Sequence, residues 1–183
     1  MRTDKISQIA NRSSFKRIAI FGRPGSGKST FASHLSLKTG LPCYHLDKIF
    51  FGPGWVERPS EDFLTDQRGC VKKSAWIIDG NSFRSLEIRY ENADLCLYFE
   101  LPFWLCCYRI FKRIITRDGT IDDRADHCPE RLNIKLLWYC LSLRKRALPK
   151  LKTLKELYPN VLILTVRSRK EVRELFTYLA KKS

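Results

Sequence analysis

The stretch FGRPGSGKSTF at residues 21–31 sets the fold that the rest of the chain has to follow. It fits the pattern G-x-x-x-x-G-K-[ST] without deviation. An apolar, β-branched run, KRIAIFG, leads into it, and apolar or small residues at helical spacing follow it as far as Gly40. A strand, a glycine-rich turn and a helix in this order point backbone N–H groups at a phosphate, and the helix adds the positive end of its dipole. The stretch therefore predicts a loop that binds a nucleoside triphosphate.

The residue types of this loop have distinct physical tasks. Its glycines permit the backbone torsions that turn successive N–H groups inward. Lys28 is expected to neutralise the β- and γ-phosphates, and the Ser29 hydroxyl is expected to ligate magnesium. The predicted nucleotide-binding residues of the loop are Gly22, Arg23, Pro24, Gly25, Ser26, Gly27, Lys28, Ser29 and Thr30.

Magnesium also needs an acid at the end of a neighbouring strand. Two apolar runs end in a carboxylate, WIID at Asp79 and LYFE at Glu100. Asp79 is the preferred candidate, because Gly80 follows it and lets a ligand approach the backbone. The alternative for each is a carboxylate that caps local structure. The sequence thus predicts ATP and Mg²⁺ as cofactors, with Ser29 and Asp79 at the metal.

Strands and helices alternate along the chain. Further strands are expected in LPCYHLD, AWIIDGN, ADLCLYFELP and NVLILTV, and helices at 28–38, from Ser60 as N-cap to 72 or 73, after Pro102, after Pro129 and at 169–181. The run FFGPGWVERPS is rich in glycine and proline and is expected to be loop. This alternation predicts an α/β fold, a parallel sheet covered on both faces. Residues 15–183 form one predicted domain, after a polar extension at 1–14 that is expected to be frayed or loosely docked.

Composition describes a globular chain with a basic surface. The 183 residues are 44% hydrophobic and 12% aromatic, and the formal net charge is +15. Such a surface attracts polyanions, including nucleotides and nucleic acid. The alternatives are a solvated cationic surface around an anion-binding centre and a nucleic-acid interface, the second resting on a cluster made of Arg144, Lys145, Arg146, Lys150, Lys152 and Lys155.

The cysteines and the apolar runs bear on location. The seven cysteines contain no C-x-x-C pair, so the usual spacing of a zinc site is absent from the sequence. No apolar run reaches the roughly 20 residues that span a bilayer, and the start MRTDKISQIANRSSF has no apolar signal core. A cytoplasmic protein with no membrane partner is expected.

Three kinds of protein use such a phosphate loop: switches, motors and transferases. The N-K-x-D and D-x-x-G patterns that a GTPase switch needs are missing, and a large ATPase motor usually has more chain. A transferase needs an acceptor pocket, arginines that hold the transferred phosphoryl group and a lid that excludes water. The chain offers candidates for all three.

Parts of the chain resemble adenylate kinases. WIIDGNSFR is similar to their D-G-x-P-R segment, RIFKR to the R-I-x-x-R that opens their lid, and DDRADHCPERL to the return of that lid. The resemblance implies that Gly80 lies against the acceptor, that Arg109 stacks on the donor base and that Arg113 clamps phosphates. It implies a short lid at about 112–131, in which Arg131, or less well Arg124, contacts the transferring group.

A second resemblance is to the bacterial topology modulation proteins, a group related to adenylate kinases. The shared strings are HLD, PGW, WIIDGN, LP-WLC--R, CPERL and RSR-E, and the match covers roughly residues 16–175. It implies a kinase-like P-loop fold, a three-layer sandwich with strand order 2-3-1-4-5. The name of the group hints at an effect on DNA supercoiling, for which the sequence supplies no mechanism.

Departures from adenylate kinases concern the acceptor. Arg84 comes one residue later than the arginine of the D-G-x-P-R segment, and Asp47, Lys48 and two phenylalanines replace the residues that read AMP. Asp47 stands where related small-molecule kinases keep a carboxylate that takes the proton of an acceptor hydroxyl, which favours an alcohol; the alternative is a cap on the following turn. The predicted acceptor pocket consists of Asp47, Trp55, Gly80, Asn81 and Arg84.

Several side chains keep two interpretations. Tyr44, Phe50, Phe51 and Trp55 would either stack on an acceptor ring or belong to the core. Arg109 and Arg113 lie on one helix face, which a solvated basic face would also explain. Arg167, with Arg169, falls where relatives contact the donor base.

The sequence as a whole favours an ATP-dependent kinase of an unidentified acceptor. Its expected catalytic residues are Lys28, Asp47, Arg113 and Arg131. The alternatives are a nucleotide-gated nucleic-acid-binding protein and a polynucleotide 5′-hydroxyl kinase, both supported by the basic surface.

Overall fold

The computed structural model describes residue 9 and residues 14–116 and 134–181. Its centre is a parallel sheet of five strands: β1 (Arg17–Gly22), β2 (Cys43–His45), β5 (Trp76–Asp79), β6 (Leu95–Phe99) and β7 (Leu162–Val166). Their order is β2-β5-β1-β6-β7, which is 2-3-1-4-5 when only these strands are numbered. The predicted order is confirmed. In this register Ile20 pairs with Asp79 and Gly22 with Phe99, so the phosphate loop leaves the sheet between two strand ends.

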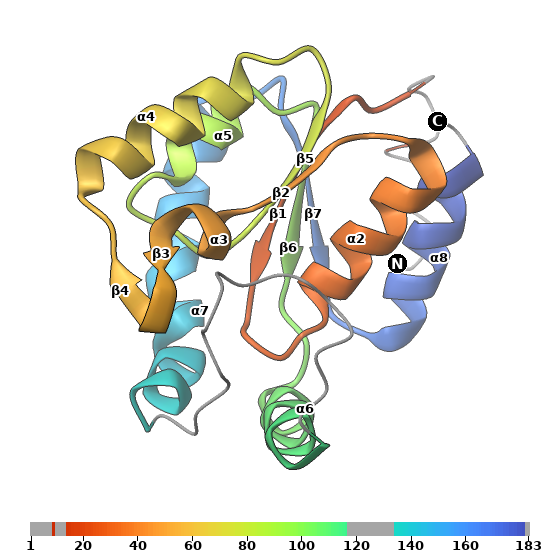
Figure 1. Ribbon diagram of the computed structural model, residues 1–183. Coiled ribbons are helices and arrows are strands. Elements are labelled where there is room, and N and C mark those ends of the chain that lie inside the picture. Colours follow the sequence, from red (N-terminus) through yellow and green to blue (C-terminus); the bar gives the residue numbers. More distant parts are fainter. Residues whose placement is uncertain (1–8, 10–13, 117–133, 182–183) are drawn as a thin grey trace.

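Helices cover both faces of the sheet (Figure 1). Helices α2 (Lys28–Thr39) and α8 (Arg169–Lys181) pack side by side on one face. The other face is covered by α4 (Ser60–Val71), α5 (Leu86–Glu91) and α7 (Ile134–Leu157). The predicted α/β three-layer sandwich is confirmed.

Strand β1 shows why the sheet is buried on both faces. Ile18 and Ile20 belong to the apolar cluster under α2 and α8, whereas Ala19 and Phe21 belong to the cluster under α4, α5 and α7. Successive residues of a strand point to opposite faces, so a strand between two helical layers has to be apolar throughout.

Residues 46–60 differ from expectation. The strand stops at His45, so that Asp47 lies in the first turn of a short helix, α3 (Leu46–Phe50). The expected loop contains an antiparallel pair, β3 (Phe51–Gly52) and β4 (Val56–Glu57), around the 3₁₀ turn η1 (Pro53–Trp55). Ser60 as N-cap is wrong: Pro59 holds that position, and its carbonyl accepts the N–H of Phe63.

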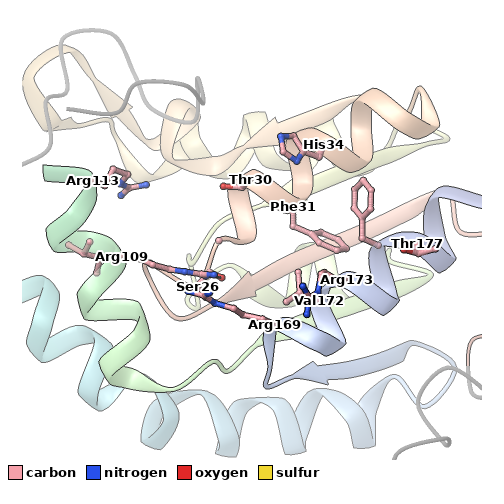
Figure 2. Close-up of a pocket in the computed structure, with 14 residues that line it drawn as sticks. Ser26, Thr30, Phe31, His34, Arg109, Arg113, Arg169, Val172, Arg173 and Thr177 are labelled. Carbon is pink, nitrogen blue, oxygen red and sulfur yellow. Dashed lines mark hydrogen bonds between the residues drawn. The ribbon is translucent and has the colours of Figure 1, made fainter. Parts of the chain in front are cut away.

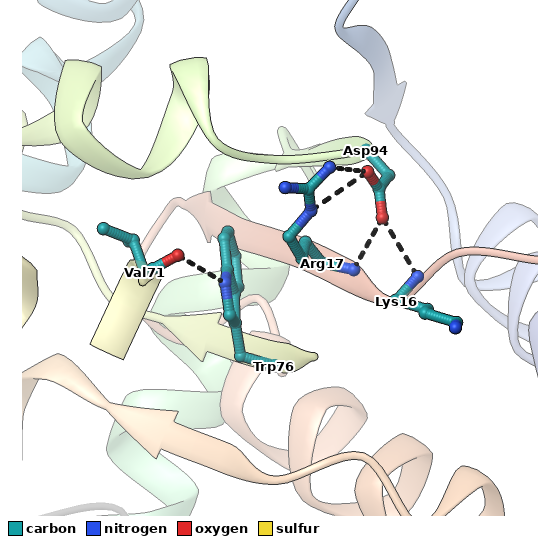
Figure 3. A network of polar contacts seen from close by, with 5 residues as sticks. All are labelled: Lys16, Arg17, Val71, Trp76 and Asp94. Carbon is teal, nitrogen blue, oxygen red and sulfur yellow. Dashed lines mark hydrogen bonds and ion pairs between the residues drawn. The ribbon is translucent and has the colours of Figure 1, made fainter. Parts of the chain in front are cut away.

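A polar network fixes the end of the sheet remote from the phosphate loop (Figure 3). Asp94 accepts the backbone N–H groups of Lys16 and Arg17 and two bonds from the Arg17 guanidinium, of 3.2 and 2.7 Å. These contacts raise the acidity of Asp94, whose pKa lies below its ordinary value although burial opposes this. Trp76 Nε1 donates to the Val71 carbonyl at 3.3 Å and joins the end of α4 to β5.

The N-terminal extension is docked at Ile9. This side chain is fully buried in the cluster under α2 and α8, and its carbonyl accepts the Tyr178 hydroxyl at 2.9 Å. Among the described helices, none is long and apolar enough to cross a bilayer.

Candidate active site

The phosphate loop is held in place by backbone contacts on two sides. Gly22 donates its N–H to Asn81 Oδ1 at 2.9 Å, and Arg23 donates its N–H to the Phe99 carbonyl at 2.9 Å. Gly25 has a φ of +73°, and a Cβ there would lie 2.5 Å from the Cys106 carbonyl oxygen. The loop thus lies between the end of β6 and α6 (Phe103–Thr116), and at Gly25 there is no room for a side chain.

Arg23 contributes to this support through its side chain. Its guanidinium donates to the Leu101 carbonyl at 2.6 Å and lies 5.9 Å from the centre of the Phe103 ring. Within the described residues the side chain is therefore turned to the start of α6, so a contact of Arg23 with phosphate is expected from its backbone.

Asp79 is a buried carboxylate beside the loop. It is 3% exposed; Oδ2 contacts His45 Nδ1 at 3.1 Å, and Oδ1 has no hydrogen-bond partner among the described residues. Burial raises the pKa of Asp79, but the Lys28 charge, His45 and the nearby Ser29 hydroxyl together bring it below its ordinary value. The carboxylate is therefore ionised, with one oxygen available.

These residues fit a magnesium ion. Mg²⁺ keeps several waters and takes one or two protein oxygens together with the phosphates of its nucleotide. Oδ1 of Asp79, which has no hydrogen-bond partner among the described residues, and the neighbouring Ser29 hydroxyl are suitable ligands. Glu100, the second candidate acid, instead accepts Arg144 Nε at 3.1 Å and Arg167 Nε at 3.0 Å.

His45 is a member of this site to which the sequence assigned no role. Its Nε2 lies 3.2 Å from Ser33 Oγ and 3.7 Å from Cys43 Sγ, so both ring nitrogens have partners. Burial lowers the pKa of His45, but the hydrogen bonds to Asp79 and Cys43 and their negative charge outweigh this effect. The net result is a pKa raised to about 10. A cationic imidazole thus holds Asp79. The position of His45 at the end of an edge strand, two residues before Asp47, was the signal available in the sequence.

An arginine-rich pocket opens on the other side of the loop (Figure 2). Its volume is about 680 Å³, and it lies between α2, α6 and α8 with residues 25–27 at one end. We call it the arginine pocket after the charged residues that line it, Arg109, Arg113, Arg169 and Arg173. Its apolar wall consists of Phe31, Ile110, Val172 and Phe176.

Arg109 connects α6 to the phosphate loop. Its Nη1 donates to the Ser26 carbonyl at 2.8 Å and would lie 3.3 Å from a Cβ at Gly27. Burial and the charge of Arg169 both lower the pKa of Arg109. Arg113, one turn later, lines the same pocket, so both arginines of RIFKR face it and Arg109 also contacts the loop.

The arginines after β7 are placed differently from each other. Arg167 bonds Glu100, and its N–H donates to Glu171 Oε2 at 3.0 Å; it is not among the residues that line the arginine pocket. Arg169 lines the pocket instead. The start of α8 explains this, because the Ser168 hydroxyl accepts the N–H of Glu171 and Arg169 becomes the first helical residue.

Three of the predicted acceptor residues, Asp47, Gly80 and Asn81, follow the ends of β2 and β5. Asp47 is exposed on α3, and Gly80 has a φ of +150° with Leu46 where a Cβ would be. Asn81 bonds the phosphate loop through its side chain, and its carbonyl accepts the Tyr139 hydroxyl at 3.3 Å. Burial raises the pKa of Tyr139 to about 12, and the charge of Asp47 adds to this.

Arg89 is a fully buried cation next to these residues. Its Nη2 donates to the Gly80 carbonyl at 3.0 Å, whereas Nε and Nη1 have no hydrogen-bond partner among the described residues. Burial lowers the pKa of Arg89 to about 10, although the charges of Asp79 and Asp47 oppose this. Its position in a short helix, α5, that the sequence did not reveal explains why it was missed.

The aromatic residues near Asp47 divide between core and surface. Phe50 packs edge-on against Phe63 with ring centres 5.1 Å apart, and Tyr44 accepts a 2.8 Å bond from Lys73. Phe51 and Trp55 form a further edge-on pair at 5.1 Å, with Trp55 half-buried. Of the remaining predicted residues, Arg84 is exposed in the loop before α5.

Two predictions of the lid lie beyond the described part of the chain. Arg131 and Arg124 fall there, as do all but the first residues of the expected lid at about 112–131.

The fold can now be compared with known proteins. A shikimate kinase from Acinetobacter baumannii, in complex with shikimate, matches with a TM-score of 0.58 and 14% identity over 92% of this chain and 93% of that one. The chain has the fold of P-loop kinases. A deoxyadenosine kinase from M. mycoides with bound dATP gives a TM-score of 0.51 at 15% identity, over 90% of this chain and 98% of that one.

A third similar structure is a gluconokinase from Sinorhizobium meliloti 1021. Its TM-score is 0.53 and its identity 16%, over 91% of this chain and 92% of that one. No protein-family model matches the chain, and no curated protein does.

Proposed function

We propose that the protein is a kinase that transfers the γ-phosphoryl group of a nucleoside triphosphate, expected to be ATP, to an acceptor hydroxyl. One observation carries the proposal: the buried Asp79 has an oxygen without a hydrogen-bond partner among the described residues, and it lies beside Lys28 and Ser29, while Asp47 follows the neighbouring strand. The kinase fold of the similar structures supports it.

The chain's residues supply positioning and charge. The N–H groups of the loop and Lys28 bind the β- and γ-phosphates, and Arg109 and Arg113 add positive charge from α6. Magnesium, when bound to Ser29 and Asp79, neutralises charge on the phosphates. Transfer breaks the bond between the γ-phosphorus and the β-γ bridging oxygen and forms one to the acceptor oxygen. The proton of the acceptor hydroxyl passes to Asp47, and Arg131 is proposed to stabilise the transferring group.

The acceptor is proposed to be a small alcohol rather than AMP. The support is Asp47, which is exposed near the end of β2 and lies close enough to influence the buried Arg89 and Tyr139. Membership of the topology modulation group and a cytoplasmic location remain predictions of the sequence.

Two variants test the assignment. The wild type, Lys28→Ala and Asp47→Asn are incubated with Mg²⁺, γ-labelled ATP and separate pools of nucleosides, nucleotides, sugars and 5′-hydroxyl oligonucleotides. We expect label in one pool, none with Lys28→Ala, and loss of transfer with normal ATP binding in Asp47→Asn. Loss of both binding and transfer in Asp47→Asn would show a structural role for this residue.

The same assay separates the alternatives. Label in the oligonucleotide pool would identify a polynucleotide 5′-hydroxyl kinase. Release of free phosphate alone, accelerated by DNA, would contradict the kinase and support the nucleotide-gated nucleic-acid-binding protein.

A further inference from the structure

We propose that the arginine pocket prefers a donor with a 6-oxopurine base, guanine or hypoxanthine, over one with adenine. The inference rests on the proposed function, because it assumes that the phosphate loop holds the triphosphate of the donor. It changes the expected donor from ATP to a nucleotide such as GTP, and it assigns the base-reading role to Arg169 and Arg173.

The first step is the direction in which the nucleotide extends. The pocket begins at residues 25–27 of the phosphate loop and continues between α2 and α8 (Figure 2). Phe31 and Phe176 pack edge-on in its wall, with ring centres 5.8 Å apart, and Val172 lies beside them. A base attached to a triphosphate in the loop would therefore meet an apolar surface that suits its flat faces.

The second step is the set of polar groups around this surface. The charged side chains that line the pocket are arginines, and its other polar side chains are Thr30, His34 and Thr177; no carboxylate or carboxamide lines it in the described part of the chain. A guanidinium only donates hydrogen bonds. Guanine and hypoxanthine present two acceptors, O6 and N7, on one edge, a pattern that arginine reads with two bonds; adenine has an amino donor in place of O6.

The third step identifies which arginines are available. Arg109 already donates to the Ser26 carbonyl. The guanidinium groups of Arg169 and Arg173, one helical turn apart on α8, make no hydrogen bond or ion pair with any described residue. Arg169 also lies close enough to Arg109 for their charges to repel, and an acceptor-rich base edge between the arginines would relieve this repulsion.

Equilibrium binding without an acceptor tests the proposal. ATP, GTP and ITP, each with Mg²⁺, compete against a fluorescent nucleotide; ITP is the sharpest probe, because its base has oxygen where adenine has its amino group. We expect ITP and GTP to bind about tenfold more tightly than ATP. In Arg169→Gln/Arg173→Gln the preference should disappear or reverse, because a carboxamide pairs well with adenine.

Lys170→Gln is the matched control. It removes a positive charge from the same helix at an exposed position that does not line the arginine pocket, and should keep the wild-type preference. Thermal unfolding of each variant verifies that it is folded.

Three results would overturn the inference. ATP binding as tightly as ITP to the wild type would contradict it while leaving the proposed function intact. Equal weakening of all three nucleotides in the double variant would show that Arg169 and Arg173 contact phosphates rather than the base. Absence of binding by all three nucleotides would reject the proposed function itself.

Discussion

His45 and Asp79 form an ion pair whose strength depends on pH. Because the folded pKa of His45 is raised to about 10, the stability it contributes is fully present below its unfolded pKa, about 6.5, and is lost as pH rises towards 10. Asp79 behaves oppositely: its folded pKa is lowered, so its contribution is lost as pH falls below its unfolded value, about 3.9.

At the residue scale we therefore expect His45→Gln to cost most stability at pH about 6 and progressively less towards pH about 10. Glutamine keeps a hydrogen-bond donor but carries no charge, so the change isolates the ion pair. Urea unfolding of wild type and variant across this range measures the difference. A difference that stays constant with pH would contradict a cationic His45.

The same variant reports on the metal site. In His45→Gln, Asp79 loses the charged ring that holds its Oδ2 in position, so a higher Mg²⁺ concentration should be needed for half-maximal nucleotide binding, by roughly 10-fold. Titration of Mg²⁺ at fixed nucleotide measures this. A shift in nucleotide affinity with no change in the Mg²⁺ requirement would argue against a role of His45 in positioning Asp79.

A site residue could be predicted from the sequence when its neighbours in the chain indicated its role. Asp79 follows an apolar run and precedes a glycine, and the structure places it beside Lys28 and Ser29. Arg89 had no such mark, because its burial depends on packing between α5 and the sheet. Arg169 lines the pocket and Arg167 does not, because the Arg167 side chain bonds Glu100 beyond the end of β6, a tertiary contact that the local sequence does not mark.

At the element scale, the phosphate loop is predicted to tolerate no side chain at Gly25. Gly25→Ala would need a left-handed backbone and a Cβ 2.5 Å from a carbonyl oxygen of α6. We expect loss of nucleotide binding. We also expect the free energy of unfolding to fall by more than the cost of the left-handed backbone alone, which is about 1–2 kcal/mol.

Gly40→Ala is the control for this change. Gly40 has nearly the same φ, +72°, at the end of α2, but nothing lies within 4 Å of a Cβ there. The free energy of unfolding of Gly40→Ala should fall only by the cost of the left-handed backbone, about 1–2 kcal/mol, and the variant should bind nucleotide normally. Isothermal titration measures nucleotide binding by both variants, and urea unfolding measures their stability. Equal binding and equal stability of Gly25→Ala and Gly40→Ala would show that the contact with α6 is unimportant.

Long elements were predictable and short ones were not. The strands at β1, β5, β6 and β7 have continuous apolar runs, and α2 and α8 are long enough to show helical spacing and end signals. Helices α3 and α5 have 5 and 6 residues, too few for a period to be recognised. These two helices are held by tertiary contacts. The positions of Asp47 on α3 and of Arg89 on α5 could therefore not be predicted from the sequence.

At the scale of the whole molecule, the net charge of +15 predicts weak binding to DNA that salt removes. The basic cluster on α7 is largely exposed, but Arg144 is already paired with Glu100. We expect duplex DNA to be bound at low salt and released at about 150 mM salt, and Lys152→Gln/Lys155→Gln to reduce the salt dependence. Fluorescence anisotropy with labelled DNA measures both.

The result bears directly on function. Tight binding that persists at about 150 mM salt and survives Lys28→Ala would favour the nucleic-acid-binding alternative over a small-molecule kinase. Binding that vanishes would identify the basic surface as a solvated one.

The bond from Gly22 to Asn81 has an evolutionary consequence. Asn81 stands at the edge of the predicted acceptor pocket, yet its side chain holds the first glycine of the phosphate loop. A substitution that adapted position 81 to a new acceptor would also remove the hydrogen bond to Gly22 and weaken the binding of the donor. Within the segment that follows β5, acceptor preference would therefore be free to diverge only from the next position onward, and Ser82 is where this chain departs from the D-G-x-P-R segment of adenylate kinases.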